Sequence, residues 1–254
     1  MRRVDRRLSP CPLTWRMQVQ RALPDHPTFL REAAKFERLG INSDVRRLGF
    51  ATYAPHVLLK RKSGRAEFPA TWGRHKEVIA TMSYRKCVYC EAPITAPRAA
   101  HIEHFKPKAL FPAQAYEWTN FFLGCPGCNG AKSDKWPKRN GYIRPDRGDP
   151  SKQFVFRNDG TVRAAKPGSV ADRMLDDLDL KREWLSQERK LNITEMLRLL
   201  DSAVRFQRGG NTPQAKILAA TILRNISSPE RAYSAALMQC FWRAWKNACP
   251  RVKL

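Results

Sequence analysis

Two closely spaced pairs of cysteines constrain the fold of this chain more strongly than any other feature of its sequence. Cys87 and Cys90 form the first pair, and Cys125 and Cys128 form the second, so that the whole pattern is C-x2-C-x34-C-x2-C. A gap of two residues lets both thiolates of a pair turn toward one ion, and two such pairs complete a tetrahedral site of four sulfurs. The pattern therefore predicts a structural zinc ion that joins the two ends of the intervening segment and on which the folding of this region depends.

The other cysteines and the N-terminal segment indicate in which cellular compartment the protein is expected. Cys11, Cys240 and Cys249 have no CxxC neighbour, and we expect them to be free thiols. The segment MRRVDRRLSPCP lacks the apolar stretch of an export signal, and no apolar run approaches the ~18 residues of a membrane span. We therefore expect a cytoplasmic protein without a membrane partner, in a reducing compartment where cysteine clusters bind metals.

The charge of the chain indicates its partner. The formal net charge is +24 at pH 7, and the excess of lysine and arginine is spread along the whole sequence. Solubility alone rarely needs so large an imbalance of one sign, so a polyanion is the expected partner. Nucleic acid is the commonest polyanion, and an anionic membrane surface is a weaker candidate. With 43% hydrophobic residues and seven tryptophans, the chain has the composition of a folded protein.

Three regions differ in composition. Residues 1–80 are expected to be mostly helical, and the apolar side chains of 27–40 recur at helical spacing up to Gly40. Residues 81–150 hold the cysteine pairs and many turn-forming residues, which is typical of a small metal-organised module. Residues 151–254 begin with a predicted β-hairpin and continue as a C-terminal helical region.

Turn and cap signals predict the elements of this last region. Gly160, which follows an Asn-Asp pair, is expected in the turn of the hairpin. Ser169 is predicted to cap a helix. Thr212 and Ser228 are each followed by proline, which matches an N-cap with proline at the first helical position, so two more helices are expected to begin there.

Five polar residues lie between the cysteine pairs or directly after them, and four thiolates around zinc would leave them free: His101, Glu103, His104, Asn120 and Asn129. Their arrangement resembles that of the HNH, or ββα-metal, nuclease fold. In that fold an acid–His pair ends the first strand, an asparagine lies in the connecting loop, and a histidine or asparagine opens the helix. The resemblance implies an α+β protein, mainly α, in which a small ββα-metal HNH core with a four-cysteine zinc site is flanked by N- and C-terminal helical regions.

The chain also resembles a narrower group, the cysteine-framed HNH proteins of bacterial anti-phage systems, namely the Septu nuclease subunit and its retron-associated relatives. Four runs carry the likeness: CVYC at 87–90, EHFKPK at 103–108, WTN at 118–120, and CPGCNGAK at 125–132. The flanking helices match only in general character. The group implies a role in defence against phage beside an ATPase partner, and the chain itself has no GxxxxGK[ST] run that would bind ATP.

Phosphodiester hydrolysis needs an activated water and stabilisation of negative charge, and these residue types can supply both. A histidine with a pKa of about 6.5 is largely neutral at physiological pH, and we assign His104 as the general base. Glu103 and the side-chain oxygen of Asn129 suit a hard catalytic ion. Many HNH enzymes have histidine where this chain has Asn129, so Mg²⁺ or Mn²⁺ is favoured over Ni²⁺ or Zn²⁺. By the resemblance, Asn120 holds the loop and orients the base.

Positively charged residues near this motif are candidates for nucleic-acid binding. Lys132, one turn after Asn129, is predicted to reach a phosphate. Lys106 and Lys108 are predicted to do the same, although both can also be solvated charges. His101 lies two residues before the acid of the motif, hence on the same side of a strand. Its role stays open between an extra metal ligand, a phosphate contact and a structural residue.

The expected function is therefore a metal-dependent HNH endonuclease that hydrolyses phosphodiester bonds, with DNA favoured as the substrate. The rival is a non-catalytic nucleic-acid-binding protein, in which the zinc module presents basic residues and helices. That rival explains the charge and the cysteines but not Glu103, His104 and Asn129 together. A third hypothesis keeps the chemistry and directs it at RNA such as tRNA, because the phosphate chemistry does not need to identify the sugar.

Overall fold

The computed structural model describes residues 1–254 apart from 9, 24, 40–42, 97–98 and 139–140. About 53% of the chain is helical, and the described residues contain three sheets of two antiparallel strands each. This agrees with the predicted class, α+β and mainly α. Within the described ranges, no helix is both long enough and apolar enough to span a bilayer.

Helices and short strands follow one another along the chain. The helices are α1 (Trp15–Ala22), α2 (His26–Arg38), α3 (Asp44–Leu48), α4 (Phe50–Tyr53), α5 (Lys76–Thr81), α6 (Pro126–Lys132), α7 (Val170–Asp177), α8 (Glu183–Arg208), α9 (Thr212–Ser227) and α10 (Ser234–Ala248). The strands are β1 (Leu59–Lys60), β2 (Ala66–Glu67), β3 (His101–His104), β4 (Phe121–Gly124), β5 (Phe154–Phe156) and β6 (Val162–Ala164). Short 3₁₀ helices include η2 (Pro55–Val57), η3 (Thr71–His75) and η6 (Trp118–Asn120).

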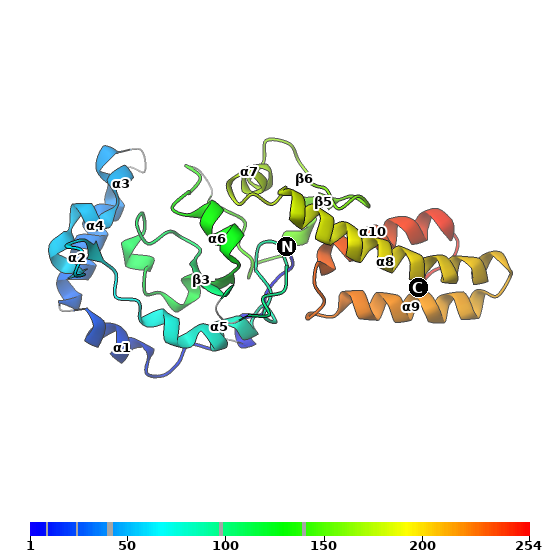
Figure 1. The fold of residues 1–254 in the computed structure, drawn as a ribbon, viewed down its shortest axis with the longest axis horizontal. Coiled ribbons are helices and arrows are strands. Elements are labelled where there is room, and N and C mark those ends of the chain that lie inside the picture. The colour runs from blue at the N-terminus through cyan, green and yellow to red at the C-terminus, as the bar shows by residue number, and fades with distance from the viewer. Residues whose placement is uncertain (9, 24, 40–42, 97–98, 139–140) are drawn as a thin grey trace.

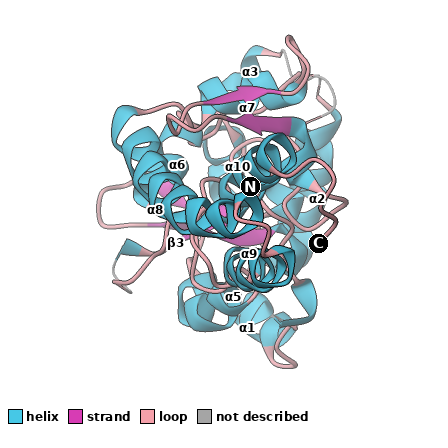
Figure 2. Cartoon of the chain, turned by 90° about the vertical axis from the view of Figure 1, so that its right-hand side faces the viewer, coloured by secondary structure: helices cyan, strands magenta, loops and turns pink. Residues whose placement is uncertain are grey.

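The chain progresses along the long axis of the molecule (Figure 1). The N-terminal helices α1–α4 lie at one end, β3 and α6 lie near the middle, and α8, α9 and α10 form a bundle at the other end. Figure 2 looks along this axis, so that the bundle helices are seen nearly end-on. Within the bundle, α8 packs against both α9 and α10. The part that carries the cysteine pairs thus lies between two helical parts.

Local signals in the sequence account for several of these elements. The side chain of Asp25 caps α2 by accepting a hydrogen bond from the Thr28 N–H at 3.0 Å. The predicted helix is confirmed, and its expected end at Gly40 lies outside the described residues. The predicted β5–β6 hairpin is also confirmed, with Gly160 in its turn at a φ of 83°. A Cβ at this position would collide with the Ser186 carbonyl of α8, so only glycine fits.

Of the three helix starts predicted in the C-terminal region, two are confirmed and one is wrong. α7 directly follows its N-cap Ser169, although the Ser169 hydroxyl makes no capping hydrogen bond. α9 begins at Thr212, but its N-cap is Asn211 and not the predicted Thr212, because the Asn211 side chain accepts the Gln214 N–H at 3.1 Å.

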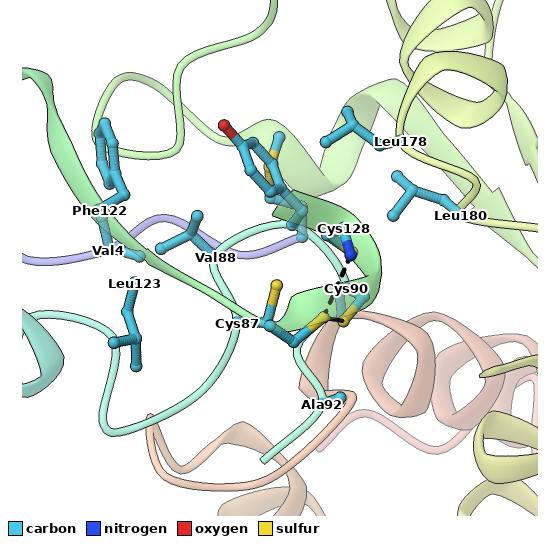
Figure 3. Packing of buried hydrophobic residues seen from close by; sticks show 14 of the residues in the cluster. Val4, Cys87, Val88, Cys90, Ala92, Phe122, Leu123, Cys128, Leu178 and Leu180 are labelled. Atoms are coloured by element: carbon cyan, nitrogen blue, oxygen red, sulfur yellow. Dashed lines mark hydrogen bonds between the residues drawn. The ribbon is translucent and has the colours of Figure 1, made fainter. Parts of the chain in front are cut away.

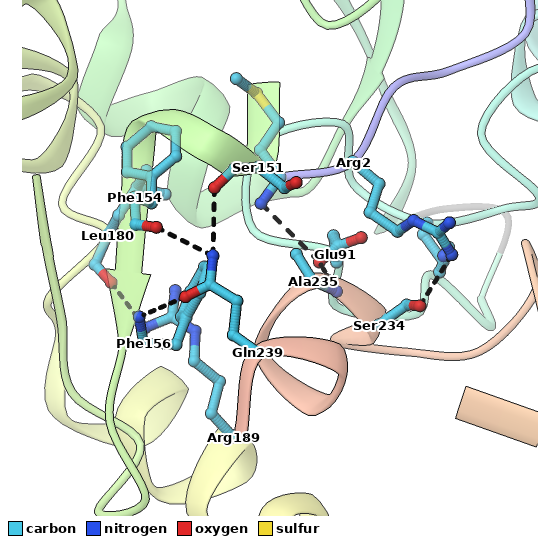
Figure 4. Close-up of polar contacts among 12 residues, drawn as sticks. Arg2, Glu91, Ser151, Phe154, Phe156, Leu180, Arg189, Ser234, Ala235 and Gln239 are labelled. Atoms are coloured by element: carbon cyan, nitrogen blue, oxygen red, sulfur yellow. Dashed lines mark hydrogen bonds and ion pairs between the residues drawn. The ribbon is translucent and has the colours of Figure 1, made fainter. Parts of the chain in front are cut away.

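α10, however, begins well after Ser228. A tertiary contact explains the difference, because the Glu91 carboxylate accepts a hydrogen bond from the Ala235 N–H at 3.1 Å (Figure 4). This cap comes from 144 residues away in the chain, and no local signal near the helix reveals it.

One buried apolar cluster runs through all three sequence regions. It includes Phe29 in α2, Leu123 in β4 and Trp245 in α10. The N-terminal segment links the regions further, since the Val4 N–H donates to the Pro145 carbonyl at 2.9 Å. The hairpin β3–β4 and α6 are therefore supported on both sides by packed structure.

Candidate metal centre and active site

The four cysteines of the two pairs meet at one buried centre. The Sγ atoms of Cys87, Cys90, Cys125 and Cys128 all lie within 4.8 Å of one another, and the described residues hold no other such group of His, Cys, Asp or Glu. The Sγ atoms of Cys90 and Cys125 are 3.8 Å apart. A zinc tetrahedron with Zn–S bonds of about 2.3 Å separates its sulfurs by about 3.8 Å. Figure 3 shows Cys87, Cys90 and Cys128 converging among apolar side chains. The centre is thus built to bind a structural metal such as zinc.

Backbone hydrogen bonds bring the two cysteine pairs together. Cys125 is the N-cap of α6, where its Sγ accepts the Cys128 N–H at 3.4 Å. The first pair is tied to β4, because the Val88 N–H donates to the Leu123 carbonyl at 3.0 Å. A metal ion at this centre would therefore fasten the β3–β4 hairpin to α6.

A charge partner of the cysteine centre comes from a distant part of the chain and has no motif in the sequence. Arg182, directly before α8, donates from Nη2 to the Sγ atoms of Cys128 and Cys125 at 3.4 and 3.7 Å. A zinc ion with four thiolates carries a net negative charge, which this guanidinium offsets. Gly127 leaves the space for it, since a Cβ there would lie 3.3 Å from Nη2 of Arg182.

β3 and β4 form an antiparallel hairpin that leads almost directly into α6. His101 lies opposite Gly124, and His104 lies opposite Phe121. Because side chains alternate along a strand, His101 and Glu103 share one face of the hairpin and His104 points to the other. The strand–strand–helix order is the one that the family resemblance implies.

His104 is held in one orientation by aromatic rings and a carbonyl. It is 9% exposed, and its ring lies edge-on to Trp72 and Phe121, with centroids 4.6 and 5.1 Å away. Nε2 donates to the Ala115 carbonyl at 3.0 Å, because a carbonyl oxygen can only accept. Nδ1 therefore carries the lone pair of the neutral ring. Burial, and after it the charge of Lys108, lower the pKa of His104 to about 3, so the ring is neutral at physiological pH.

Glu103 lies on the other face of the hairpin in a buried ion pair. It is 3% exposed, and its Oε1 lies 2.6 Å from Nζ of Lys132 and accepts the Tyr89 hydroxyl at 3.1 Å. Burial raises the pKa of Glu103, while Lys132 and Tyr89 act in the opposite direction. Tyr89 lies inside the first cysteine pair, so the cysteine centre also positions this carboxylate.

Asn129 lies beside Glu103 and contacts His101. A Cβ built on Gly124 would lie 3.3 Å from Cβ of Glu103 and 3.6 Å from Cβ of Asn129, so all three residues pack side by side. The Asn129 amide donates from Nδ2 to Nδ1 of His101 at 3.0 Å. His101 is exposed and Asn129 is half-buried, so this edge of the hairpin faces solvent. Its donors are an amide oxygen, an imidazole and a carboxylate.

Asn120 closes the loop between the two strands. It is 2% exposed, and its Oδ1 accepts the Lys106 N–H at 2.8 Å. Its Nδ2 donates to the carbonyls of Lys106 and Gln114 at 3.0 and 2.9 Å. The residue after Gln114 in the chain, Ala115, holds the ring of His104. In this position Asn120 fixes the loop that orients the imidazole.

The structure changes the role predicted for Lys132. This residue is 1% exposed, and its ammonium donates to the His104 carbonyl at 2.9 Å as well as pairing with Glu103. α6 turns this position toward the hairpin, where the ammonium neutralises a buried carboxylate. The phosphate contact predicted for Lys132 therefore does not fit this geometry.

Lys106 and Lys108 are half-buried and lie over aromatic rings. Nζ of Lys106 is 5.3 Å from the centroid of Phe111, and Nζ of Lys108 is 4.7 Å from that of Trp72. Burial lowers the pKa of Lys108. Because Trp72 also contacts His104, Lys108 places a positive charge next to the imidazole.

Comparison with known proteins finds distant relatives. No protein-family model matches the chain. Septu protein PtuB of Bacillus thuringiensis is 33% identical over 92 residues, which are 35% of this chain and 36% of that protein. Septu protein PtuB of Bacillus mycoides (strain KBAB4) is 23% identical over 214 residues, which are 65% of this chain and 72% of that protein. The chain is thus similar to Septu proteins, although the first alignment spans only about a third of that relative.

Proposed function

We propose that this protein is an HNH endonuclease that hydrolyses phosphodiester bonds of nucleic acid with a divalent metal ion, and that it acts in Septu-type anti-phage defence. DNA is the favoured substrate. The proposal depends most on the orientation of His104, whose Nδ1 lone pair is left available by the hydrogen bond from Nε2 to the Ala115 carbonyl. The similarity to Septu protein PtuB supports the defence role within this proposal.

His104 serves as the general base in this proposal. A water hydrogen-bonded to Nδ1 gives up its proton to the ring as its oxygen attacks the phosphorus. The bond from phosphorus to the leaving sugar oxygen breaks, and that oxygen takes up a proton from solvent. The Ala115 carbonyl already accepts a hydrogen bond from the Nε2–H, so it stabilises the imidazolium that forms. With a pKa of about 3 the free ring is a weak base. A phosphate bound beside it adds negative charge, which raises the pKa of His104 and makes proton transfer more favourable.

Glu103 and Asn129 are the residues that would hold the divalent ion. His101 lies beside them, but its Nδ1 lone pair accepts the Asn129 amide, so it would become a third ligand only by giving up that hydrogen bond. The donors fit a hard ion, since Lys132 and Tyr89 both approach Oε1 of Glu103 and leave its Oε2 for metal. The Oδ1 atom of Asn129 has no hydrogen-bond partner among the described residues. Mg²⁺ or Mn²⁺, when bound, supplies positive charge that stabilises the scissile phosphate.

The cysteine centre has a structural part in this proposal. Four thiolates close the coordination of zinc, so the ion activates no water. Its first cysteine pair carries Tyr89, which contacts Glu103, and its second pair begins the helix that carries Asn129. The zinc centre thereby fixes the carboxylate and the amide relative to each other.

An ATPase partner enters the proposal through the family resemblance, because this sequence has no phosphate-binding loop of its own. Such a partner would sense infection or restrain the nuclease. The net charge of +24 suits a nucleic-acid substrate.

Cleavage assays test the proposal. The purified protein is incubated with plasmid, single-stranded DNA and total RNA in Mg²⁺, Mn²⁺ or EDTA, both alone and with the products of neighbouring genes. We expect DNA to be cut with a divalent ion, and not in EDTA or by the His104→Ala variant. His56→Ala changes an exposed histidine on η2 and should cut like the wild type.

Other outcomes distinguish the alternatives. Cleavage of RNA alone would keep the chemistry and replace the substrate. If wild type and His104→Ala bind nucleic acid equally and neither cuts under any condition, the protein is better described as a non-catalytic nucleic-acid-binding protein.

A further inference from the structure

A short basic hairpin lies close to the candidate active site. β1 and β2 pair through two residues each, and in the turn between them the Gly64 N–H donates to the Arg61 carbonyl at 2.8 Å. We call residues 60–65, with the sequence Lys-Arg-Lys-Ser-Gly-Arg, the basic tip. Four of these six residues are cationic, none is acidic, and all six are exposed.

The basic tip is poorly neutralised within the protein. Arg61 forms an ion pair with Glu67 at 2.8 Å. Lys60, Lys62 and Arg65 have no acidic partner within ion-pair distance in the part of the chain that the structure describes. Like charges on neighbouring strands repel, and a hairpin of two short strands is marginal by itself. Apart from the pair of Arg61 with Glu67, the charges of the tip are unbalanced in the isolated protein, and a polyanion is the partner that would balance them.

A chain of side-chain contacts connects the basic tip to His104. β2 leads into Phe68, and Nζ of Lys108 lies 5.4 Å from the centroid of that ring. The same ammonium lies 4.7 Å from the centroid of Trp72, whose ring contacts His104 at 4.6 Å. Arg61 lies within electrostatic range of Lys108, as do the carboxylates of Asp134 and Glu67. The cations of the tip and Lys108 thus continue toward the imidazole.

We propose that the basic tip binds the phosphate backbone of the substrate beside the bond that is cut. This inference rests on the proposed nuclease function. Phosphates along a nucleic acid repeat at short intervals with one charge each, so adjacent exposed cations bind them without reading bases. The tip contributes affinity for the nucleic acid and fixes its position along the protein, while Lys108 places a further positive charge next to His104.

The cavity between the N-terminal segment and α10 suits a polyanion less well. It has a volume of about 490 Å³. Three cations line it, namely Arg2, Arg3 and Lys86, but so do the carboxylates of Asp5, Glu91 and Asp149. Its mixed charge contrasts with the single sign of the basic tip.

A binding measurement tests the proposal without depending on cleavage. The probe is a short fluorescent DNA duplex, with RNA of the same sequence as a second arm, and EDTA is present throughout. Affinity is measured by anisotropy at several salt concentrations. We expect Lys60→Gln/Lys62→Gln/Arg65→Gln to bind about 10-fold or more weakly, and its slope of log affinity against log salt to fall by about 2 to 3.

Matched variants decide whether the effect is local. Lys190→Gln/Lys216→Gln/Arg224→Gln removes three exposed cations of α8 and α9 and should change binding little. The exchange Lys60→Arg/Lys62→Arg/Arg65→Lys should bind like wild type. Equal loss in the tip and bundle variants, or no loss in the tip variant, would overturn the proposal. If the tip variant alone loses affinity while wild type cuts nothing with any metal, the binding surface stands and the nuclease function fails.

Discussion

The cysteine centre and the candidate active site use the same hairpin and helix but hold their charges in different ways. In the cysteine centre four like ligands converge within 4.8 Å, and one guanidinium balances them from outside. In the candidate active site the Glu103 carboxylate is already paired with Lys132 at 2.6 Å, while Asn129 and His101 face solvent. The first site needs a metal ion to hold four repelling thiolates together. The second keeps its shape through an internal ion pair, so under the proposed function it would exchange metal and substrate without unfolding.

Removing the cysteine centre should have the largest effect. Structural zinc binds with apparent free energies of about 10–16 kcal/mol, and these are coupled to folding. We expect Cys87→Ser/Cys125→Ser to lose zinc and to unfold the region of β3, β4 and α6. Metal analysis and near-UV circular dichroism measure both. Cys240→Ser, a buried thiol outside the centre, should keep its zinc. If zinc is retained after all four cysteines of the centre are changed to serine, the assignment of these cysteines as zinc ligands is wrong.

The internal ion pair of the candidate active site should be the next most costly feature to break. Lys132→Met leaves Glu103 buried without its cation, which costs about 3–5 kcal/mol of unfolding free energy. The double variant Glu103→Gln/Lys132→Met should recover part of this loss, as measured by chemical denaturation. Lys135→Met, at an exposed position, serves as the control. An equal cost for Lys132→Met and Lys135→Met would argue against the buried pair.

The buried neutral ring of His104 should make stability depend on pH. Its pKa is about 3 in the folded protein, against about 6.5 for histidine in an unfolded chain. As the pH falls below about 6.5 the unfolded chain takes up a proton that the folded protein does not, so the folded state loses stability toward pH 3. Compared with His104→Gln, wild type should lose about 2 kcal/mol more between pH 7 and pH 5. Denaturation at both pH values measures this, and a pH-independent difference would show that the ring is not buried in its neutral form.

Removing the outer charge of the cysteine centre should have the smallest effect. Groups that hydrogen-bond to metal ligands contribute about 10- to 100-fold to metal affinity. We expect Arg182→Gln to fold normally and to lose zinc about 10-fold more readily in a chelator competition. Arg173→Gln, which changes an exposed arginine of α7, should behave like wild type. No difference between these variants would mean that the guanidinium contributes nothing to metal binding.

The cysteine centre can be predicted because its signal is local. Each pair has a two-residue gap that suits one metal ion, and proline after Cys125 begins α6 at the second pair. Arg182 lies 54 residues from Cys128, and only the packing of α8 brings it to the sulfur. Gly127, between the second pair of cysteines, is the local sequence feature that fits this contact, because it leaves room for the guanidinium.

The residues of the candidate active site can be predicted from the sequence, but not all of the contacts that they make. The spacing from Asn129 to Lys132 places both on neighbouring turns of α6, yet it does not say which side faces solvent. The hairpin packs against Lys132 and leaves Asn129 at the edge, which reverses the expected exposure of the lysine. The start of α10 is a similar case, because its cap is the distant carboxylate of Glu91. Where two elements meet, their packing decides which side chains are exposed and where a helix begins. The periodicity within one element does not reveal this.

In the proposed mechanism, His104 removes the proton from the attacking water. Single-turnover cleavage of DNA with Mg²⁺ and excess protein tests it most directly, with zinc content and DNA affinity measured on the same samples. We predict that His104→Ala keeps zinc, binds DNA like wild type and cuts about 100-fold or more slowly. A His104→Ala variant that keeps zinc, binds DNA and cuts at the wild-type rate would contradict it.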